Sequence, residues 1–319
     1  MMNILSALPR RPRLFNDESL ASYIYRLAIA NSFETTISLY RLANLTENTV
    51  FTRTNHSQNF NKSLRPLCIL SGKSETQLSS TIYNDDIPEY VLPIRKTKIC
   101  PKCFADNPYG RKDWDILLNT ICPVHQCLLL DHCPECKILI SWYRKSMDKC
   151  RCGFNFCRAI TPTVNKEETI FSVIVCDKYH PSLFQNQLLP GFFYTSSLSI
   201  IIDFIIFLIG QHINHSFGNK NLWGKGSLRG IRNSIIHTHL MELCDILKSL
   251  PHGIWEWTCS INMNLYYDKQ RISDFHYRFF PYDISHFIND KGKIDINNIE
   301  RFIYKMLIEG DRFSPITYT

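Results

Sequence analysis

The stretch CPVHQCLLLDHCPEC, residues 122–136, places four cysteines and two histidines in fifteen positions. It lies inside a longer series of pairs, because CPKC at 100–103 precedes it and CRC at 150–152 follows it. Two ligands separated by two residues can share one tight turn, and two such turns complete a tetrahedron around zinc. The spacing therefore predicts two metal centres that organise the middle of the chain.

Chain order gives each ion a complete set of four ligands. The two sets are Cys100, Cys103, Cys122 and His125, and Cys133, Cys136, Cys150 and Cys152. A catalytic zinc keeps one coordination position for water, so two full sets predict two structural zinc ions and no enzyme. Gly153 suits a turn in which backbone amides point at thiolate sulfur. Each of three nearby residues could be a ligand in place of one of these eight: Cys127, Cys157 and His132.

The length and composition limit the kinds of protein that this chain can be. A chain of 319 residues predicts two or three domains, and 45% hydrophobic against 20% charged residues excludes disorder of the whole chain. Nine of the thirteen cysteines lie between positions 100 and 157, and no basic-then-apolar leader opens the sequence. These features favour a cytoplasmic protein with metal-bound thiols. The apolar run at 198–210 contains an aspartate and is too short for a membrane span, so we expect a buried helix there.

Apolar periodicity and capping residues predict a mainly α fold. Helices are expected over 16–31, with Asn16 or Asp17 as the N-cap, and over 36–45, 233–250 and 297–309. Within 67–83, Gly72 separates two expected helices, and Ser74 with Gln77 has the spacing of a capping box at the start of the second. A helix, a short glycine turn and a helix is the arrangement of helix-turn-helix modules. His237 and His239 point to different sides of their helix, and we expect both on the surface.

Three domains follow from these patterns. They are an N-terminal helical, helix-turn-helix-like domain (1–95), a two-zinc region (96–159) and a C-terminal helical domain (160–319) that begins with a linker at 160–169.

A net charge of +7 permits a nucleic-acid partner without requiring one. The second helix of the helix-turn-helix-like element has no Lys or Arg, so we expect it to contact protein or form a dimer. Basic residues gather instead near the cysteine pairs. The candidates for nucleic-acid backbone contact are Lys96, Lys98, Lys102, Arg111, Lys112, Arg144, Lys145, Lys149 and Arg151, with Tyr109, Trp142 and Tyr143 as stacking surfaces. An ordinary solvated surface is the competing interpretation.

The chain resembles the TniQ family, related to TnsD, of Tn7-like and Tn5053-like transposons. The resemblance lies in the opening LPRRPRLFNDESLASYIYRLAIAN (8–31), in the cysteine pairs with Arg111 and Trp114 between the first two, and in CRCG (150–153). LKSLPHGIWEW at 247–257 is a weaker counterpart of a family segment.

This resemblance implies target selection in DNA transposition without catalysis. Such proteins connect a target site to an AAA+ ATPase of the TnsC or TniB kind, and some dock on a CRISPR guide-RNA complex, often as dimers. An extended N-terminal segment containing Arg10, Arg11 and Arg13 could then lie on the ATPase. The end at Thr319 favours such an adaptor over a longer, self-sufficient DNA-binding selector of the TnsD kind. That selector remains the alternative, and a zinc hydrolase is a remote one.

Overall fold

The computed structural model describes residues 6–44, 64–83, 87, 91–92, 96–142, 144–177 and 230–248, with isolated positions from 189 to 209. Its contacts divide the chain into two compact units, Met1–Gln185 with Lys220–Thr238, and Asn186–Asn219 with His239–Thr319. The predicted helix at 297–309 and the segment 251–257 lie outside the described residues. In the apolar run at 198–210 the described positions are helical, and its described isoleucines and leucines are buried, as expected. Among the helices that the structure describes, none is long and apolar enough to cross a membrane.

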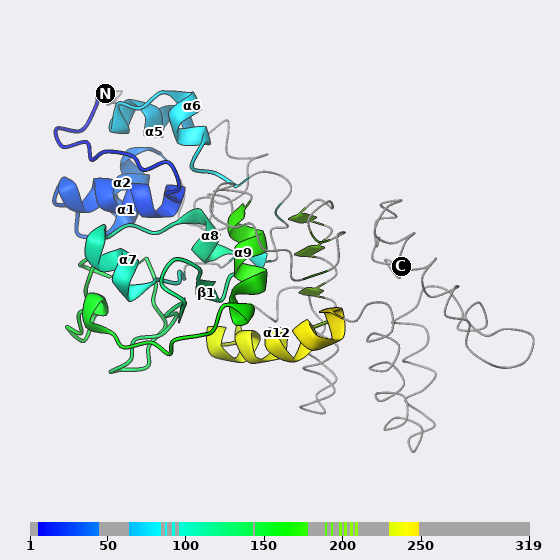
Figure 1. The fold of residues 1–319 in the computed structure, drawn as a ribbon. Helices are drawn as coiled ribbons and strands as arrows, with labels where there is room; N and C mark the ends of the chain where they lie inside the picture. The colour runs from blue at the N-terminus through cyan, green and yellow to red at the C-terminus, as the bar shows by residue number, and fades with distance from the viewer. Residues whose placement is uncertain are drawn as a thin grey trace, which may run out of the picture. The chain divides into compact units, whose positions relative to one another are not determined.

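The first unit begins with an extended segment and two helices, α1 (Leu20–Ala30) and α2 (Thr36–Leu42) (Figure 1). The N-cap of α1 is Ser19, whose hydroxyl accepts from the Ser22 N–H at 3.3 Å. The expectation of Asn16 or Asp17 as the cap was wrong. Glu18, which lies between those residues and the helix, is fully buried and accepts a hydrogen bond from Ser22 Oγ.

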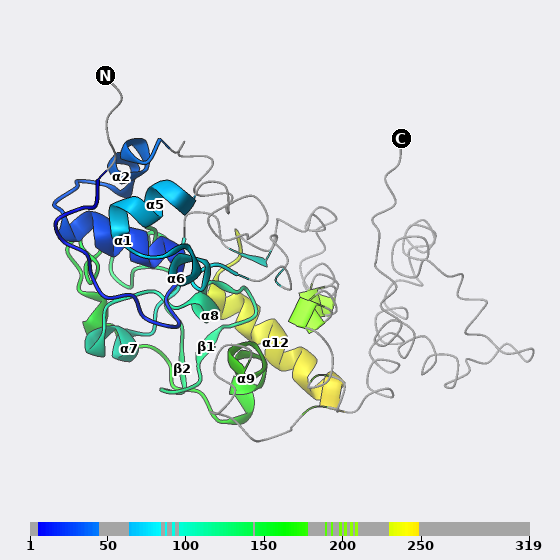
Figure 2. The same cartoon turned by 90° about the horizontal axis from the view of Figure 1, so that it is seen from above.

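A second pair of short helices follows, α5 (Leu64–Ser71) and α6 (Glu75–Ser79), which lie beside α1 in both views (Figures 1 and 2). Gly72 has φ of 63° in the turn between them, a conformation that favours glycine. The Ser74 hydroxyl accepts from Gln77 N, and the Gln77 side chain accepts from Ser74 N, as the capping-box spacing predicts. The assignment of these helices to a helix-turn-helix module stays a prediction.

The cysteine-rich part of the chain is built from very short elements. They are α7 (Pro101–Asp106), α8 (Lys112–Asp115), the hairpin β1 (Ile121–Cys122) and β2 (Cys127–Leu128), and the 3-10 turn η2 (Phe156–Arg158). The strands are antiparallel, with Cys122 opposite Cys127 and Ile121 opposite Leu128. The prediction of a mainly α fold is confirmed for the described residues, which contain little strand.

Residues 160–169 are not a free linker. Leu128 N donates to Pro162 O at 3.1 Å and Val164 N to Gln126 O at 2.9 Å, so this stretch pairs with the hairpin. The chain then forms η3 (Glu167–Thr169) and α9 (Ile170–Asp177).

The last described helix is α12 (Asn233–Lys248), as the periodicity predicted. Its predicted apolar face, Ile236, Leu240, Leu243 and Leu247, is fully buried. On the same helix His237 is partly buried and His239 is buried beside Glu242, so the surface expectation for this pair was wrong.

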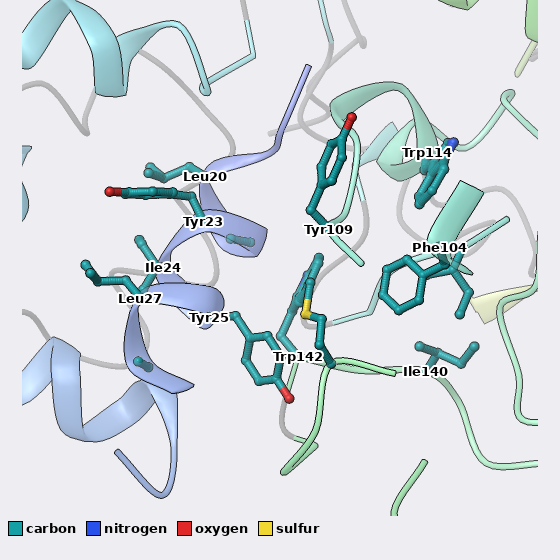
Figure 3. Packing of buried hydrophobic residues seen from close by; sticks show 14 of the residues in the cluster. Leu20, Tyr23, Ile24, Tyr25, Leu27, Phe104, Tyr109, Trp114, Ile140 and Trp142 are labelled. Carbon is teal, nitrogen blue, oxygen red and sulfur yellow. The ribbon is translucent and has the colours of Figure 1, made fainter. Parts of the chain in front are cut away.

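One core cluster joins the N-terminal helices to the cysteine-rich part (Figure 3). Tyr25 of α1 faces Trp142 with ring centroids 5.9 Å apart, and Phe104 lies 6.5 Å from Trp114. Four metal-site cysteines belong to this cluster: Cys100, Cys103, Cys122 and Cys133. Folding of the helices and assembly of the cysteine pairs are thus physically linked.

Gly110 is expected to be intolerant of a side chain. A Cβ there would lie 2.5 Å from the Trp142 ring and 3.3 Å from Ser22 Cβ. Overpacking of this kind costs about 1–3 kcal/mol, so Gly110→Ala should lower the urea midpoint and perturb the Trp142 near-UV signal. Gly230→Ala is the matched control because a Cβ there meets nothing within 4 Å. Equal midpoints for the two variants would contradict the close packing.

Candidate metal centres

The first centre gathers side chains from α7 and from the β1–β2 hairpin. His125 Nδ1 lies 3.1 Å from Cys103 Sγ, 3.4 Å from Cys100 Sγ and 3.6 Å from Cys122 Sγ. Cys103 Sγ and Cys122 Sγ are 3.7 Å apart. All four ligand atoms lie within 4.8 Å of one another, so they surround a single point.

The second centre has the same arrangement with four sulfurs. Cys133 Sγ lies 3.7 Å from Cys152 Sγ, and Cys136 Sγ lies 3.6 Å from Cys150 Sγ. These four ligand atoms also lie within 4.8 Å of one another. The sets grouped by chain order are therefore the sets that the fold brings together, and each can hold one metal ion.

The spacing within both centres fits a tetrahedral cation. Zinc–sulfur bonds of about 2.3 Å at tetrahedral angles separate two sulfurs by about 3.8 Å, whereas a disulfide requires about 2.05 Å. The observed sulfur pairs at 3.6–3.7 Å match the first value. Every cysteine of both centres is free of disulfides.

Local backbone turns set these positions. Cys100 is the N-cap of α7 with Pro101 at its first position, where proline has no N–H to satisfy. At the second centre, Cys133 N donates to Ile138 O, and Lys137 N donates to Cys133 O with φ of 59° at Lys137. Gly153 has φ of 94° and donates to Cys150 O, which explains the glycine after the CRC pair.

The thiols of the two clusters differ in how readily they ionise. The pKa of Cys103 is raised to about 12 by its hydrogen bond with Cys100 and by burial, so ionisation of this thiol alone is unfavourable. A backbone N–H from Ile138 instead lowers the pKa of Cys136 to about 7. A bound metal ion would supply the positive charge that stabilises neighbouring thiolates. A thiol that coordinates a metal ion is therefore deprotonated.

The three open residues lie outside both sets of four. Cys127 Sγ is 3.7 Å from Cys100 Sγ, next to the first centre. His132 Nδ1 lies 2.9 Å from Asp131 Oδ1, and Cys157 N donates to Asn155 Oδ1 at 2.9 Å within η2.

The opening segment is tied to this region through a buried carboxylate that sequence reasoning did not single out. Glu18 is fully buried and accepts from Ser22 Oγ at 2.8 Å and from Arg26 Nη1 at 2.7 Å. Ser22 Oγ in turn accepts from Gly110 N at 2.8 Å. The sequence signal for this network is the spacing of Glu18, Ser22 and Arg26 at i, i+4 and i+8, which places the three side chains on one face. Burial raises the pKa of Glu18 despite the neighbouring arginine.

Arg111 and Trp114 lie against the first centre. The Arg111 guanidinium is 5.3 Å from the Trp114 ring centroid and 3.3 Å from Asp17. Burial lowers the pKa of Arg111. Attraction to Cys103 and to nearby acidic groups outweighs this effect, so the net pKa of Arg111 is raised.

The family model described as TniQ matches residues 9–129, which run from the opening segment through the first metal centre to β2. Residues 9–129 are therefore a TniQ domain. No curated protein matches the chain. The second centre, from Cys133 to Cys152, follows the matched range.

The structure separates the candidate basic residues into three groups by exposure. The exposed ones are Lys102, Lys145, Lys149 and Arg151; the intermediate ones are Lys96 and Arg111; the buried ones are Lys98, Lys112 and Arg144. Arg144 donates to the Ser141 and Met147 carbonyls and lies 5.3 Å from the Trp142 ring centroid. Lys112 Nζ donates to Ser80 O at 2.7 Å. The three buried side chains therefore donate hydrogen bonds to carbonyls inside the protein rather than lying on its surface.

The proposed stacking residues are also largely internal. Tyr109 is 7% exposed and stacks on Phe15 at 4.2 Å, and Trp142 is 3% exposed. Tyr143 lies outside the described residues. Arg10, Arg11 and Arg13 are all exposed, and the extended segment that carries them is held by Asn31, which donates to Arg10 O at 2.6 Å.

Asp115, the last residue of α8, and Lys98 are both buried and lie close enough to interact electrostatically. Asp115 accepts from Tyr83 at 3.0 Å and from Thr97 at 2.9 Å, and desolvation raises its pKa to about 7. Lys98 Nζ donates to the Ile116 carbonyl at 2.8 Å, and desolvation lowers its pKa to about 7.

The Asp115 shift predicts a pH dependence of folding. A carboxyl whose pKa rises from 3.8 to about 7 on folding stabilises the folded state fully below pH 4, and this contribution is lost as the pH rises to 7. Compared with Asp115→Asn, the wild-type unfolding free energy should fall by about 1 kcal/mol per pH unit between pH 5 and 7. Lys98, whose pKa is lowered to about 7, begins to lose its proton only towards the upper end of that range, so the comparison is cleanest between pH 5 and 6. Parallel urea-derived curves for the two proteins would contradict the shift.

Proposed function

We propose that this protein is a non-enzymatic target-selection adaptor in DNA transposition. It would link a target-recognition complex, either a CRISPR guide-RNA effector or another DNA-bound assembly, to an AAA+ ATPase regulator of the TnsC or TniB kind. The observation that carries the proposal is the TniQ domain at 9–129, built around one of two closed four-ligand centres. In this proposal the chain is cytoplasmic and can act as a homodimer.

Two structural zinc ions are part of this proposal. The donor sets, three thiolates with one imidazole and four thiolates, suit zinc among the biological divalent ions. Both sets offer four protein ligands, so neither needs a water to complete a tetrahedron. Zinc would hold the short helices and the hairpin together rather than activate a substrate.

One contact pattern resembling a catalytic triad does not support an enzyme. Thr120 Oγ1 lies 3.3 Å from His237 Nδ1, and His237 Nε2 lies 3.4 Å from Glu168. That order resembles a nucleophile, a base and an orienting acid. Thr120 is only 1% exposed, however, so a substrate carbonyl could not reach its hydroxyl.

The adaptor role is tested by pull-down of the tagged chain with the ATPase and any CRISPR effector encoded beside it, each with and without DNA. Retention of the ATPase together with the effector in the absence of DNA supports the adaptor. Retention of the ATPase only on one duplex, with a preference of about 10³ over a scrambled duplex, supports the direct DNA reader. Retention of neither partner would contradict both forms of target selection.

Nucleic-acid contact is assigned in this proposal to the exposed side chains Lys145, Lys149 and Arg151 around the second centre. Their joint replacement by Gln should weaken binding to any duplex and reduce the log–log salt slope by up to about 0.9 per lost phosphate contact. The matched control removes three exposed charges elsewhere: Arg41, Arg65 and Lys166. Fluorescence anisotropy at several salt concentrations measures both. Equal slopes for the two triple variants would contradict this interface.

A further inference from the structure

The first metal centre has a fifth sulfur beside it. Cys127 lies opposite Cys122 in the hairpin, is 1% exposed, and places its Sγ 3.7 Å from Cys100 Sγ. It does not belong to the set of four ligand atoms that lie within 4.8 Å of one another. Cys127 therefore touches one corner of the tetrahedron from outside.

The chemistry of a bound cation fixes the direction of this contact. A metal-bound Cys100 is a thiolate and can only accept a hydrogen bond, so the hydrogen between the two sulfurs must belong to Cys127. The Cys127 thiol is therefore the donor to the Cys100 thiolate across the 3.7 Å between their sulfurs.

The backbone holds Cys127 in place. Cys127 forms an isolated β-bridge with Thr163, and Leu128 N donates to Pro162 O. The stretch 160–164 thus covers the hairpin on the side of Cys127. A buried sulfur held between two backbone segments has little freedom to turn away from Cys100.

We infer that Cys127 is a positioning residue of the first metal centre, whose thiol donates a hydrogen bond to the Cys100 thiolate and strengthens metal retention. The inference rests on the proposed zinc ion at that centre. Hydrogen bonds to metal ligands orient them, and their loss typically weakens metal binding about 10–100-fold. Cys127 is thereby distinguished from the four ligands, whose loss removes the site.

The test compares full-length wild type, Cys127→Ala, Cys127→Ser and the control Cys68→Ala, where Cys68 is outside both centres. Zinc release to a competing chelator is followed for each. Cys127→Ala should still bind two zinc ions but release one of them about 10–100-fold more readily. Cys127→Ser keeps a donor and should lie closer to wild type. The second centre provides an internal control because its release should not change.

Cobalt substitution separates a positioning residue from a ligand. The thiolate-to-cobalt charge-transfer intensity of Cys127→Ala should equal that of wild type, because the number of coordinating sulfurs is unchanged. Loss of intensity corresponding to one thiolate would overturn the inference by making Cys127 a ligand. Unchanged zinc release in Cys127→Ala would overturn it by removing any role. Failure of the wild type to bind two metal ions would instead refute the zinc proposal itself.

Discussion

Chelation of both metal ions is expected to unfold the cysteine-rich region and to loosen the N-terminal helices with it. Structural zinc contributes about 10–16 kcal/mol in small zinc-binding peptides at pH 7, which is as large as the total stability of a typical domain, about 5–15 kcal/mol. The effect should spread because Cys100 and Cys133 share one core with α1. Purified protein should contain two zinc ions per chain, and a strong chelator should abolish the cooperative thermal melt.

Buried tryptophans report this loss directly. Trp114 and Trp142 are 1% and 3% exposed, so unfolding should shift their fluorescence to longer wavelength. Cys122→Ser should lose one zinc ion per chain, whereas Cys68→Ser, which alters a cysteine outside both centres, should lose none. A melt that is unchanged by chelation, in protein without zinc, would contradict the metal assignment.

The second large effect is expected at the ion pair between Glu18 and Arg26. Arg26→Leu should cost about 3–5 kcal/mol, because it leaves a fully buried carboxylate without its cation. Glu18→Gln should cost less, since an amide can still interact with Ser22 and Arg26. Urea unfolding of the metal-loaded protein measures both, and zinc content must stay at two per chain for the comparison to hold.

A double-mutant cycle isolates the pair. Glu18→Leu with Arg26→Leu should be less destabilising than the sum of the single variants, because neither charge is then buried alone. The matched control is the exposed pair Lys248–Asp245 at 3.5 Å, where Asp245→Asn should change stability by less than about 1 kcal/mol. Strict additivity at Glu18 and Arg26 would show that the ion pair does not couple them.

The two groups of four candidate ligands were predictable because the information that specifies them is local. A pair such as Cys100 and Cys103 shares one turn whatever the rest of the fold does, and chain order grouped the pairs as the structure has them. The capping box at Ser74 and the apolar face of α12 are equally local and were also predicted. Cap choice at α1 failed because Asn16, Asp17 and Ser19 are all good caps and only the backbone geometry selects among them.

The sequence by itself determined the ligand types, their spacing and the faces of the main helices, since each depends on residues a few positions apart. The tertiary structure alone decided which basic residues reach solvent. Lys98 and Arg144 are buried because carbonyls of Ile116 and Met147 meet their donors in the folded chain. It also placed Cys127 beside Cys100, which are 27 positions apart. Such contacts depend on how distant segments pack, and no local pattern records them.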